Sequence, residues 1–481
     1  MINPLINGVW RLPFDVMCNV LAASQHSTIS ALMKSCHALY TEGPRHLLHD
    51  GVELDSAQQI TLFADFMLTE DPSRFAYMRK LGLSIQSPVN LSAQLRLCVL
   101  LGHPSLALET LILQYAETLL GDGVFPLLHE ALGRLKTVKN LVALRVQRRS
   151  AAVIKSLPSK LKSISIAVDV PIEWPFDVLS TLKPFSDTLQ TLQINSEPSL
   201  RILSLLIDDG CCHFPRVRTF GIVYRDLVPA LLASPAFARA FPGITHLKLI
   251  PLDLPGTPHR YQSLTSTTLE RVIQSRERHR AWRSQPGDGV LPSLSSLVEC
   301  SGGLFAVYAL ALDHPLLTLR LWQHIEADDL PTLREVLEDT RPRHLYLSTT
   351  IGNIPQVFAT LRTLQTHTPP RIDLNISLAW SFWCNRLSEQ TLERFHSLLK
   401  SSFPPLSAGL AELHLLFANP VTARPANKSA VSDALKAFTR WALEAAPSLI
   451  LTCSISADEA WRWPDLGQDD DEFSPGRMRW N

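Results

Sequence analysis

Cysteine and histidine are the residue types through which this chain would hold a metal ion or a reactive thiol. The sequence has eight cysteines and sixteen histidines, but no two cysteines form the Cys-x-x-Cys pair of zinc and redox sites. His246 and His344 fall in stretches expected to be strands, away from metal-ligand spacing. We therefore expect no bound metal, no cofactor, and buried free thiols in a reducing compartment.

Catalytic motifs are also missing from the sequence. It contains no Gly-x-Ser-x-Gly turn, no phosphate-binding Walker loop, no His-Glu-x-x-His pair and no dinucleotide glycine fingerprint. Without a recognisable pair of nucleophile and base, we expect no catalytic residues and no enzymatic activity. An enzyme or a nucleic-acid-binding protein is the least favoured alternative.

Composition narrows the class of protein further. Of the 481 residues, 46% are hydrophobic, which is enough for a large buried core. Lys and Arg total 45, as do Asp and Glu, so no general attraction to nucleic acid or to an anionic membrane is expected, although local patches are not excluded. The sequence has neither a signal peptide nor a membrane-spanning stretch of about 20 apolar residues. We expect a cytoplasmic or nuclear protein without membrane contact.

Residues 9–50 predict a small helical module that differs from the rest of the chain. Leu12-Pro13 favours the start of a helix, and one apolar stripe follows at Val16, Met17, Val20 and Leu21. A second helix is expected from Ser27 or Thr28 to Gly43-Pro44. So small a module must pack on the next domain or present apolar surface to a partner.

The order of residues in this module resembles an F-box. The run Leu-Pro-Phe-Asp-Val-Met-Cys-Asn-Val-Leu spans residues 12–21, and Leu32, Cys36 and Leu39-Tyr40 follow at the spacing of the family. His37 stands where the family usually has arginine, and the late tryptophan is missing. The resemblance implies binding to a Skp-type linker protein of a cullin-based ligase through Leu12, Pro13, Val16, Val20, Leu21 and Leu32. The alternative is a plain helical cap on the repeats, with the same leucines facing inwards.

From residue 78 onward, the pattern Φ-x-x-Φ-x-Φ, with Φ apolar, recurs. The first seven copies begin at Met78, Leu108, Leu141, Leu161, Leu189, Val217 and Ile244, which are 30, 33, 20, 28, 28 and 27 residues apart. Later copies begin at Leu316, Pro342, Arg371 and Leu410. The spacing is typical of degenerate leucine-rich repeats. It predicts an α/β fold: a right-handed leucine-rich-repeat solenoid with parallel strands on the concave side, helices on the convex side and a small all-α module at its N-terminus. An ordinary doubly wound α/β domain is the runner-up.

The expected domain organisation follows from these patterns. Residues 9–50 form the F-box-like module, 51–77 a helical connector, 78–460 the solenoid and 461–481 a disordered tail. A proline-rich insertion at 251–292 interrupts the repeats, and its charged run from Arg276 to Arg283 is interpreted as a solvated helix face. The alternative is that this run contacts nucleic acid or an acidic partner.

These features together predict a substrate-recognition adaptor of a cullin-based, SCF-type ubiquitin ligase. The F-box would bind the linker, and the solenoid would bind an unknown protein substrate. The alternative is a leucine-rich-repeat scaffold or inhibitor with a degenerate F-box and no ligase role.

Strand alternation predicts where the substrate would bind. The third, fifth and seventh positions of each repeat point away from the core, to the concave surface. No carboxylate occurs at these positions in the intact repeats up to Tyr346, which predicts a partner segment that is acidic or phosphorylated, with an apolar anchor. The alternative is that the insertion or the tail covers the aromatic residues. The predicted substrate-binding residues are Arg145, Lys248, Arg320, Trp322, His344 and Tyr346.

Overall fold

The structure is a computed structural model. It describes residues 13–68, 72–87, 89–120, 126–158, 160–168, 181–196, 213–224, 232, 235–251, 266–283, 294–362, 364, 370–377, 389–402, 410–418, 425–445, 450–456 and 478–479. The chain forms two compact units, Met1–Leu189 with Gly467–Asn481, and Gln190–Leu466.

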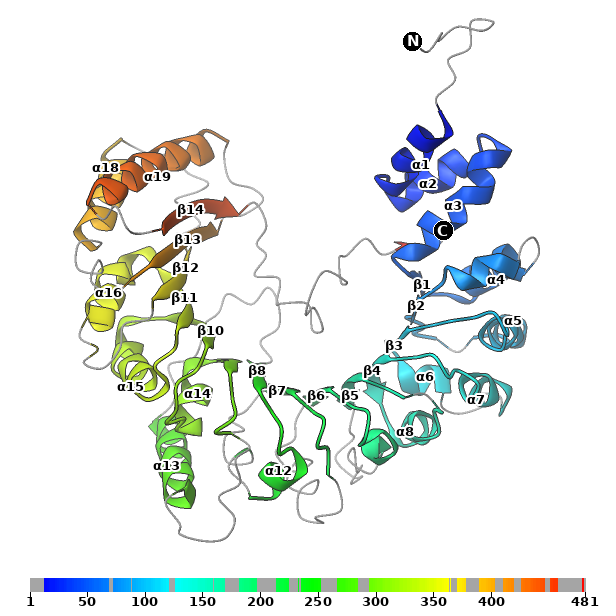
Figure 1. The fold of residues 1–481 in the computed structure, drawn as a ribbon, viewed down its shortest axis with the longest axis horizontal. Helices are drawn as coiled ribbons and strands as arrows, with labels where there is room; N and C mark the ends of the chain where they lie inside the picture. Colours follow the sequence, from blue (N-terminus) through cyan, green and yellow to red (C-terminus); the bar gives the residue numbers. More distant parts are fainter. Residues whose placement is uncertain are drawn as a thin grey trace, which may run out of the picture. The chain divides into compact units, whose positions relative to one another are not determined.

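The N-terminal module of the first unit consists of three helices, α1 (Phe14–Ala22), α2 (His26–Met33) and α3 (His37–His49) (Figure 1). The prediction of one helix from Ser27 or Thr28 to Gly43-Pro44 was wrong, because this segment forms two helices. Cys36 adopts an extended conformation that separates α2 from α3, and Pro44 lies inside α3. Leu12 lies outside the described residues.

The module has a core of its own. Its buried side chains are Leu21, Ile29, Met33, Leu39 and Leu47, and Phe66 of α4 (Ala57–Leu68) packs against them. The module is therefore attached to the first repeat through an apolar contact. A Cβ atom at Gly43 would lie 2.2 Å from Cγ of Met33, so the close approach of α2 and α3 requires a glycine there.

The first unit contains a parallel sheet whose strands follow sequence order. The strands are β1 (Val52–Leu54), β2 (Lys80–Leu83), β3 (Thr110–Leu113), β4 (Asn140–Val146) and β5 (Ser163–Val168). A short strand, β15 (Met478–Arg479), pairs with β1. The other helical segments are η1 (Pro72–Ala76), α5 (Leu91–Leu101), α6 (Ala116–Leu120), α7 (Pro126–Leu132), α8 (Arg148–Lys155) and η2 (Lys183–Phe185).

The second unit repeats the same plan, with parallel strands in sequence order. Its strands are β6 (Thr191–Ser196), β7 (Thr219–Tyr224), β8 (His246–Pro251), β9 (Glu299–Gly302), β10 (Thr318–Ile325), β11 (His344–Thr350), β12 (Arg371–Ser377), β13 (Glu412–Ala418) and β14 (Ile450–Ser456). Its helical segments are α12 (Pro235–Ala240), α13 (Ser266–Arg283), α14 (Leu304–Leu310), η3 (Ala327–Asp329), α15 (Leu330–Thr340), η4 (Ile351–Asn353), α16 (Ile354–Arg362), α18 (Glu389–Ser402) and α19 (Pro425–Ala445).

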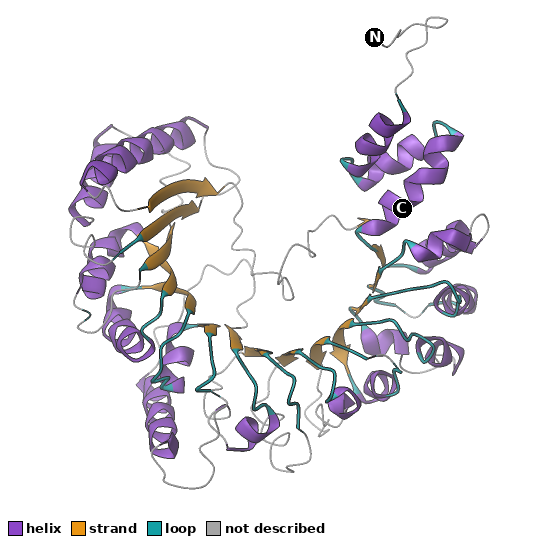
Figure 2. Cartoon of the chain, viewed as in Figure 1, coloured by secondary structure: helices purple, strands orange, loops and turns teal. Residues whose placement is uncertain are grey.

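In both units the described helices that connect the strands lie on one face of the sheet, and the strands line the other (Figure 2). We call the side on which no described helix lies the helix-free face. Strand–helix alternation with parallel pairing confirms the α/β, solenoid-like class predicted from the repeat spacing. None of the described helices is long and apolar enough to cross a membrane.

Strand pairing corrects the register of two predicted repeats. Leu141 pairs with Leu111 and Ala143 with Leu113, so the copy of the pattern that contains β4, the third in the predicted series, starts at Val138 rather than at Leu141. Likewise, Ile372 of β12 pairs with Leu345 of β11. The pattern had predicted Leu374, two residues later, as the equivalent of Leu345. In both repeats other apolar residues nearby also fit the Φ-x-x-Φ-x-Φ pattern, in full or in part, so the predicted start of the repeat was shifted.

Three strands were missed because none of them keeps the full Φ-x-x-Φ-x-Φ pattern of leucines and other large apolar residues. In β9, Cys300 pairs with Leu319 and Gly302 with Leu321. A Cβ atom at Gly302 would lie 3.0 Å from Cβ of Leu249, which explains why so small a residue occupies a core position. The other two are β14 and β1, and β1 lies in the segment 51–77 that was expected to be a helical connector.

The segment 251–292 was expected to interrupt the repeats, but α13 lies in it between β8 and β9, as helical segments lie between successive strands elsewhere in the described part of the chain. It therefore belongs to one long repeat. The expected disordered tail, 461–481, lies outside the described residues except for β15.

Candidate functional site

Helix α1 presents an apolar stripe to solvent. Pro13 is exposed, and the exposed fractions of Val16 and Val20 are 41% and 42%. Because positions i, i+3 and i+7 share one face of a helix, these three residues form a continuous patch, which we call the α1 stripe.

The other predicted linker-binding residues lie elsewhere. Leu21 is fully buried in the core of the module, and Leu32 is partly buried against that core. These two leucines face inwards, as the cap alternative expected, while the α1 stripe faces outwards. Of the predicted linker-binding residues, Leu21 and Leu32 therefore belong to the core of the module, and the residues of the α1 stripe are free to contact a partner.

The second candidate surface is the helix-free face of β9–β13. Strand register places Ser301, Arg320, Tyr346, Asp373 and His414 side by side across these five strands. We call them, together with the flanking residues Glu299, His344, Arg371 and Glu412, the charged row.

Arg320 is paired within this row on both sides. Its Nε lies 3.2 Å from Oε1 of Glu299, and its Cζ lies 4.5 Å from the centre of the Tyr346 ring. The His344 ring centre is 4.1 Å from that of Tyr346. Burial raises the pKa of the Tyr346 phenol, with Arg320 opposing the rise and Asp373 adding to it.

Asp373 is the centre of the row. One of its carboxylate oxygens lies 2.8 Å from Nε2 of His344, and the other lies 3.7 Å from Nε of Arg371 and 3.9 Å from Nε2 of His414. Burial raises the pKa of this carboxyl, but the hydrogen bond from His344 and the surrounding positive charges outweigh it and hold the pKa below its ordinary value. Arg371 also lies 3.4 Å from Glu412.

The expectation of a face without carboxylates up to Tyr346 was wrong. Glu299 enters the row from β9, one of the strands that sequence reasoning missed. The arginines of the row are therefore neutralised within the molecule, and the row carries both signs of charge. This arrangement does not specifically favour an acidic partner.

The remaining predicted substrate-binding residues are spread over the chain. Trp322 is partly buried and follows Arg320 where the register between β10 and β11 shifts. Lys248 is partly buried in β8, beside Ser301. Arg145 belongs to the first unit, has a left-handed backbone with φ of 56°, and covers the Tyr115 ring at 4.6 Å.

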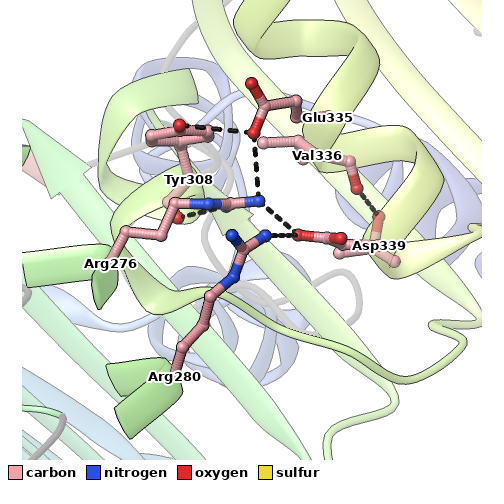
Figure 3. Close-up of polar contacts among 7 residues, drawn as sticks. Arg276, Arg280, Tyr308, Glu335, Val336 and Asp339 are labelled. Carbon is pink, nitrogen blue, oxygen red and sulfur yellow. Dashed lines mark hydrogen bonds and ion pairs between the residues drawn. The ribbon is translucent and has the colours of Figure 1, made fainter. Parts of the chain in front are cut away.

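A polar cluster that the sequence did not predict holds α13 against the helices that follow it (Figure 3). Arg276 is almost fully buried, and its guanidinium donates to the Tyr308 carbonyl oxygen at 2.8 Å and to Asp339 at 2.5 Å. Its Cζ lies 3.9 Å from the centre of the Tyr308 ring, and Glu335 lies 3.4 Å from the guanidinium. Interpreting the charged run as a solvated face was therefore wrong for Arg276, which anchors α13.

Within the described part of the chain, no group of three or more potential ligands is arranged to hold a metal ion. No protein-family model matches the sequence, and no curated protein matches it either. The fold is a parallel-strand α/β solenoid, consistent with leucine-rich repeats, that carries an N-terminal helical module.

Proposed function

We propose that this protein is a substrate-recognition adaptor of a cullin-based, SCF-type ubiquitin ligase. In this proposal α1–α3 bind a Skp-type linker protein, and the repeats bind a protein substrate. The observation that supports it best is the α1 stripe, because it remains exposed on a module that has already formed a core.

The physical argument concerns the two valines of the stripe. The core of the module is filled by Leu21 and its neighbours, so folding does not cover Val16 and Val20. Removing apolar surface from water stabilises a complex by about 25 cal/mol per Å², and branched valines lose little conformational entropy on binding. A partner groove that accepts α1 fits the helix-in-groove mode of recognition.

Co-purification of the full chain with a co-expressed Skp-type linker tests the proposal. Val16→Asp together with Val20→Asp should abolish recovery of the linker, because each carboxylate would be buried unpaired in the groove. Leu62→Asp is the matched control: Leu62 on α4 is 43% exposed and lies outside the stripe, so this variant should still recover the linker.

Circular dichroism should be the same for both variants, because both changes are at exposed positions. Recovery of the linker by the double variant at the level of the unmodified chain would rule out the stripe as the linker site. A scaffold or inhibitor without a ligase role is the second candidate, favoured by the inward positions of Leu21 and Leu32. It predicts that the unmodified chain recovers no linker.

The partner surface of the repeats is proposed to be the charged row with Trp322. Because the row contains both arginines and carboxylates, it fits a partner that presents both signs of charge around an apolar side chain. This proposal keeps Arg320, Trp322, His344 and Tyr346 of the predicted site. It leaves out Arg145 and Lys248 and changes the predicted chemistry of the partner.

A further inference from the structure

The segment from Ala131 to Val168 in the first unit has an unusual charge. It contains nine Lys or Arg residues and no Asp or Glu, although the whole chain has 45 of each kind. All nine side chains are exposed. Their positions are Arg134, Lys136, Lys139, Arg145, Arg148, Arg149, Lys155, Lys160 and Lys162.

Four of the lysines gather at one edge of the sheet. Lys139 and Lys162 each immediately precede a strand, β4 and β5, and the Lys162 amide donates to the Lys139 carbonyl oxygen at 2.7 Å. Lys136 and Lys160 lie in the same two entering loops. Because parallel strands start at the same edge, we call these four residues the lysine edge. Arg145, Arg148 and Arg149 lie at the opposite end of β4.

The positive charge of the lysine edge is only partly neutralised. Lys139 Nζ lies 3.0 Å from Oε2 of Glu109, which is itself shared with Arg79. In the described part of the chain, no carboxylate lies within ion-pair distance of Lys136, Lys160 or Lys162. This differs from the charged row of the second unit, where the arginines face carboxylates of the same molecule.

We infer that the lysine edge binds a short acidic segment of a partner protein. Neighbouring strands are about 4.8 Å apart, so ammonium groups on two adjacent loops can reach successive carboxylates of an extended chain. The contact is electrostatic, and it accelerates and orients association more than it adds affinity. The inference holds whether or not the α1 stripe binds a linker.

Two observations favour protein over nucleic acid as the partner. The segment 131–168 contains no Phe, Trp, Tyr or His, so it offers no ring on which a base could stack. The edge also supplies only four lysines, whereas nucleic-acid binding typically involves about 6–10 phosphate contacts. An anionic membrane is disfavoured because no large apolar side chain of this segment is exposed.

Fluorescence anisotropy with the full chain tests the inference. The probe is a labelled peptide of about ten residues in which aspartate alternates with glycine and serine, titrated at about 50 mM and about 200 mM salt. We expect binding that weakens with salt and falls about tenfold in the triple variant Lys136→Gln, Lys160→Gln and Lys162→Gln. These side chains are exposed, so the variant should fold normally.

The control variant removes three positive charges from the other end of β4, by Arg145→Gln, Arg148→Gln and Arg149→Gln. It should lose less than about threefold in affinity, because its changes lie beyond a Debye length of about 10 Å from the lysine edge. Equal loss in both triple variants would show a general charge effect and overturn the inference. A duplex DNA of equal charge that binds more tightly than the peptide, and is lost in the lysine variant, would overturn it in favour of nucleic acid.

Discussion

Asp373 shows how one carboxylate can organise a surface. Its oxygens face His344, Arg371 and His414 from three neighbouring strands, and only 18% of its side chain is exposed. Because β11, β12 and β13 pair in parallel register, this single residue ties them together through side chains as well as through the backbone. The side chains around it are therefore part of the fold.

A pH dependence follows from the lowered pKa of Asp373. A carboxyl whose pKa is lower in the folded state stabilises that state above its unfolded pKa, about 3.9, and the stabilisation is lost as the pH falls through the folded value. We expect Asp373→Asn to reduce stability by about 1–2 kcal/mol at neutral pH. We also expect the variant to lose less stability than the unmodified chain when the pH is lowered from about 5 to about 3.

Thermal unfolding followed at several pH values measures this difference. Asp313→Asn is the matched control, because the Asp313 side chain is 71% exposed and its removal should change neither quantity. The assignment fails if Asp373→Asn and Asp313→Asn give the same dependence on pH.

At the scale of elements, α13 is held by a charge cluster as well as by apolar packing. Arg276 joins α13 to α14 and α15, through Tyr308 and Asp339. Replacing it with leucine leaves an uncharged apolar side chain at this buried position, removes the hydrogen bonds and leaves Asp339 without its closest partner. We expect Arg276→Leu to reduce the free energy of unfolding by roughly 2–3 kcal/mol.

Arg280 provides the control for this prediction. It lies one turn further along α13, is 56% exposed and lies 3.6 Å from the same carboxylate. Arg280→Leu should cost less than about 1 kcal/mol, because exposed ion pairs contribute little. Urea unfolding of both variants measures the difference, and equal losses would show that burial of Arg276 is not what matters.

The charged row gives a prediction about partner capture. Replacing Arg320, Trp322 and Tyr346 together with alanine should remove the substrate from affinity-purified complexes but leave the linker in them. Trp322 and Tyr346 are partly exposed, and aromatic residues beside an arginine often form the energetic centre of a protein interface. Quantitative mass spectrometry of the purified complexes measures both partners.

Arg334→Ala serves as the control for this prediction, since Arg334 lies on α15 and is 43% exposed. This variant should recover the same amounts of substrate and linker as the unmodified chain. Undiminished capture of the substrate by the triple variant would place the site elsewhere.

Sequence periodicity predicted the elements where leucines fill the core positions, as Leu345 and Leu347 do in β11. It failed at β9, where Cys300 and Gly302 occupy those positions, and Leu249 lies so close that Gly302 has no room for a larger side chain. It also failed at Arg276, since nothing in a run of charged residues marks the one that is buried. The helical spacing of Val272, Arg276 and His279, all buried, was the available signal.

At the scale of the molecule, the proposed functions lie on separate elements. The α1 stripe and the lysine edge belong to the first unit, and the charged row belongs to the second. In a repeat protein each repeat contacts mainly its neighbours, so changes at one surface should leave the others intact. This independence is what an adaptor requires, because it must hold two partners at once.

Hydrogen–deuterium exchange on the full chain, with and without the Skp-type linker, tests the adaptor assignment most directly. The account predicts that the linker slows exchange in peptides covering Phe14–Ala22 and leaves β9–β13 unchanged. Failure of the linker to form a complex, or protection of β9–β13 without protection of α1, would contradict it.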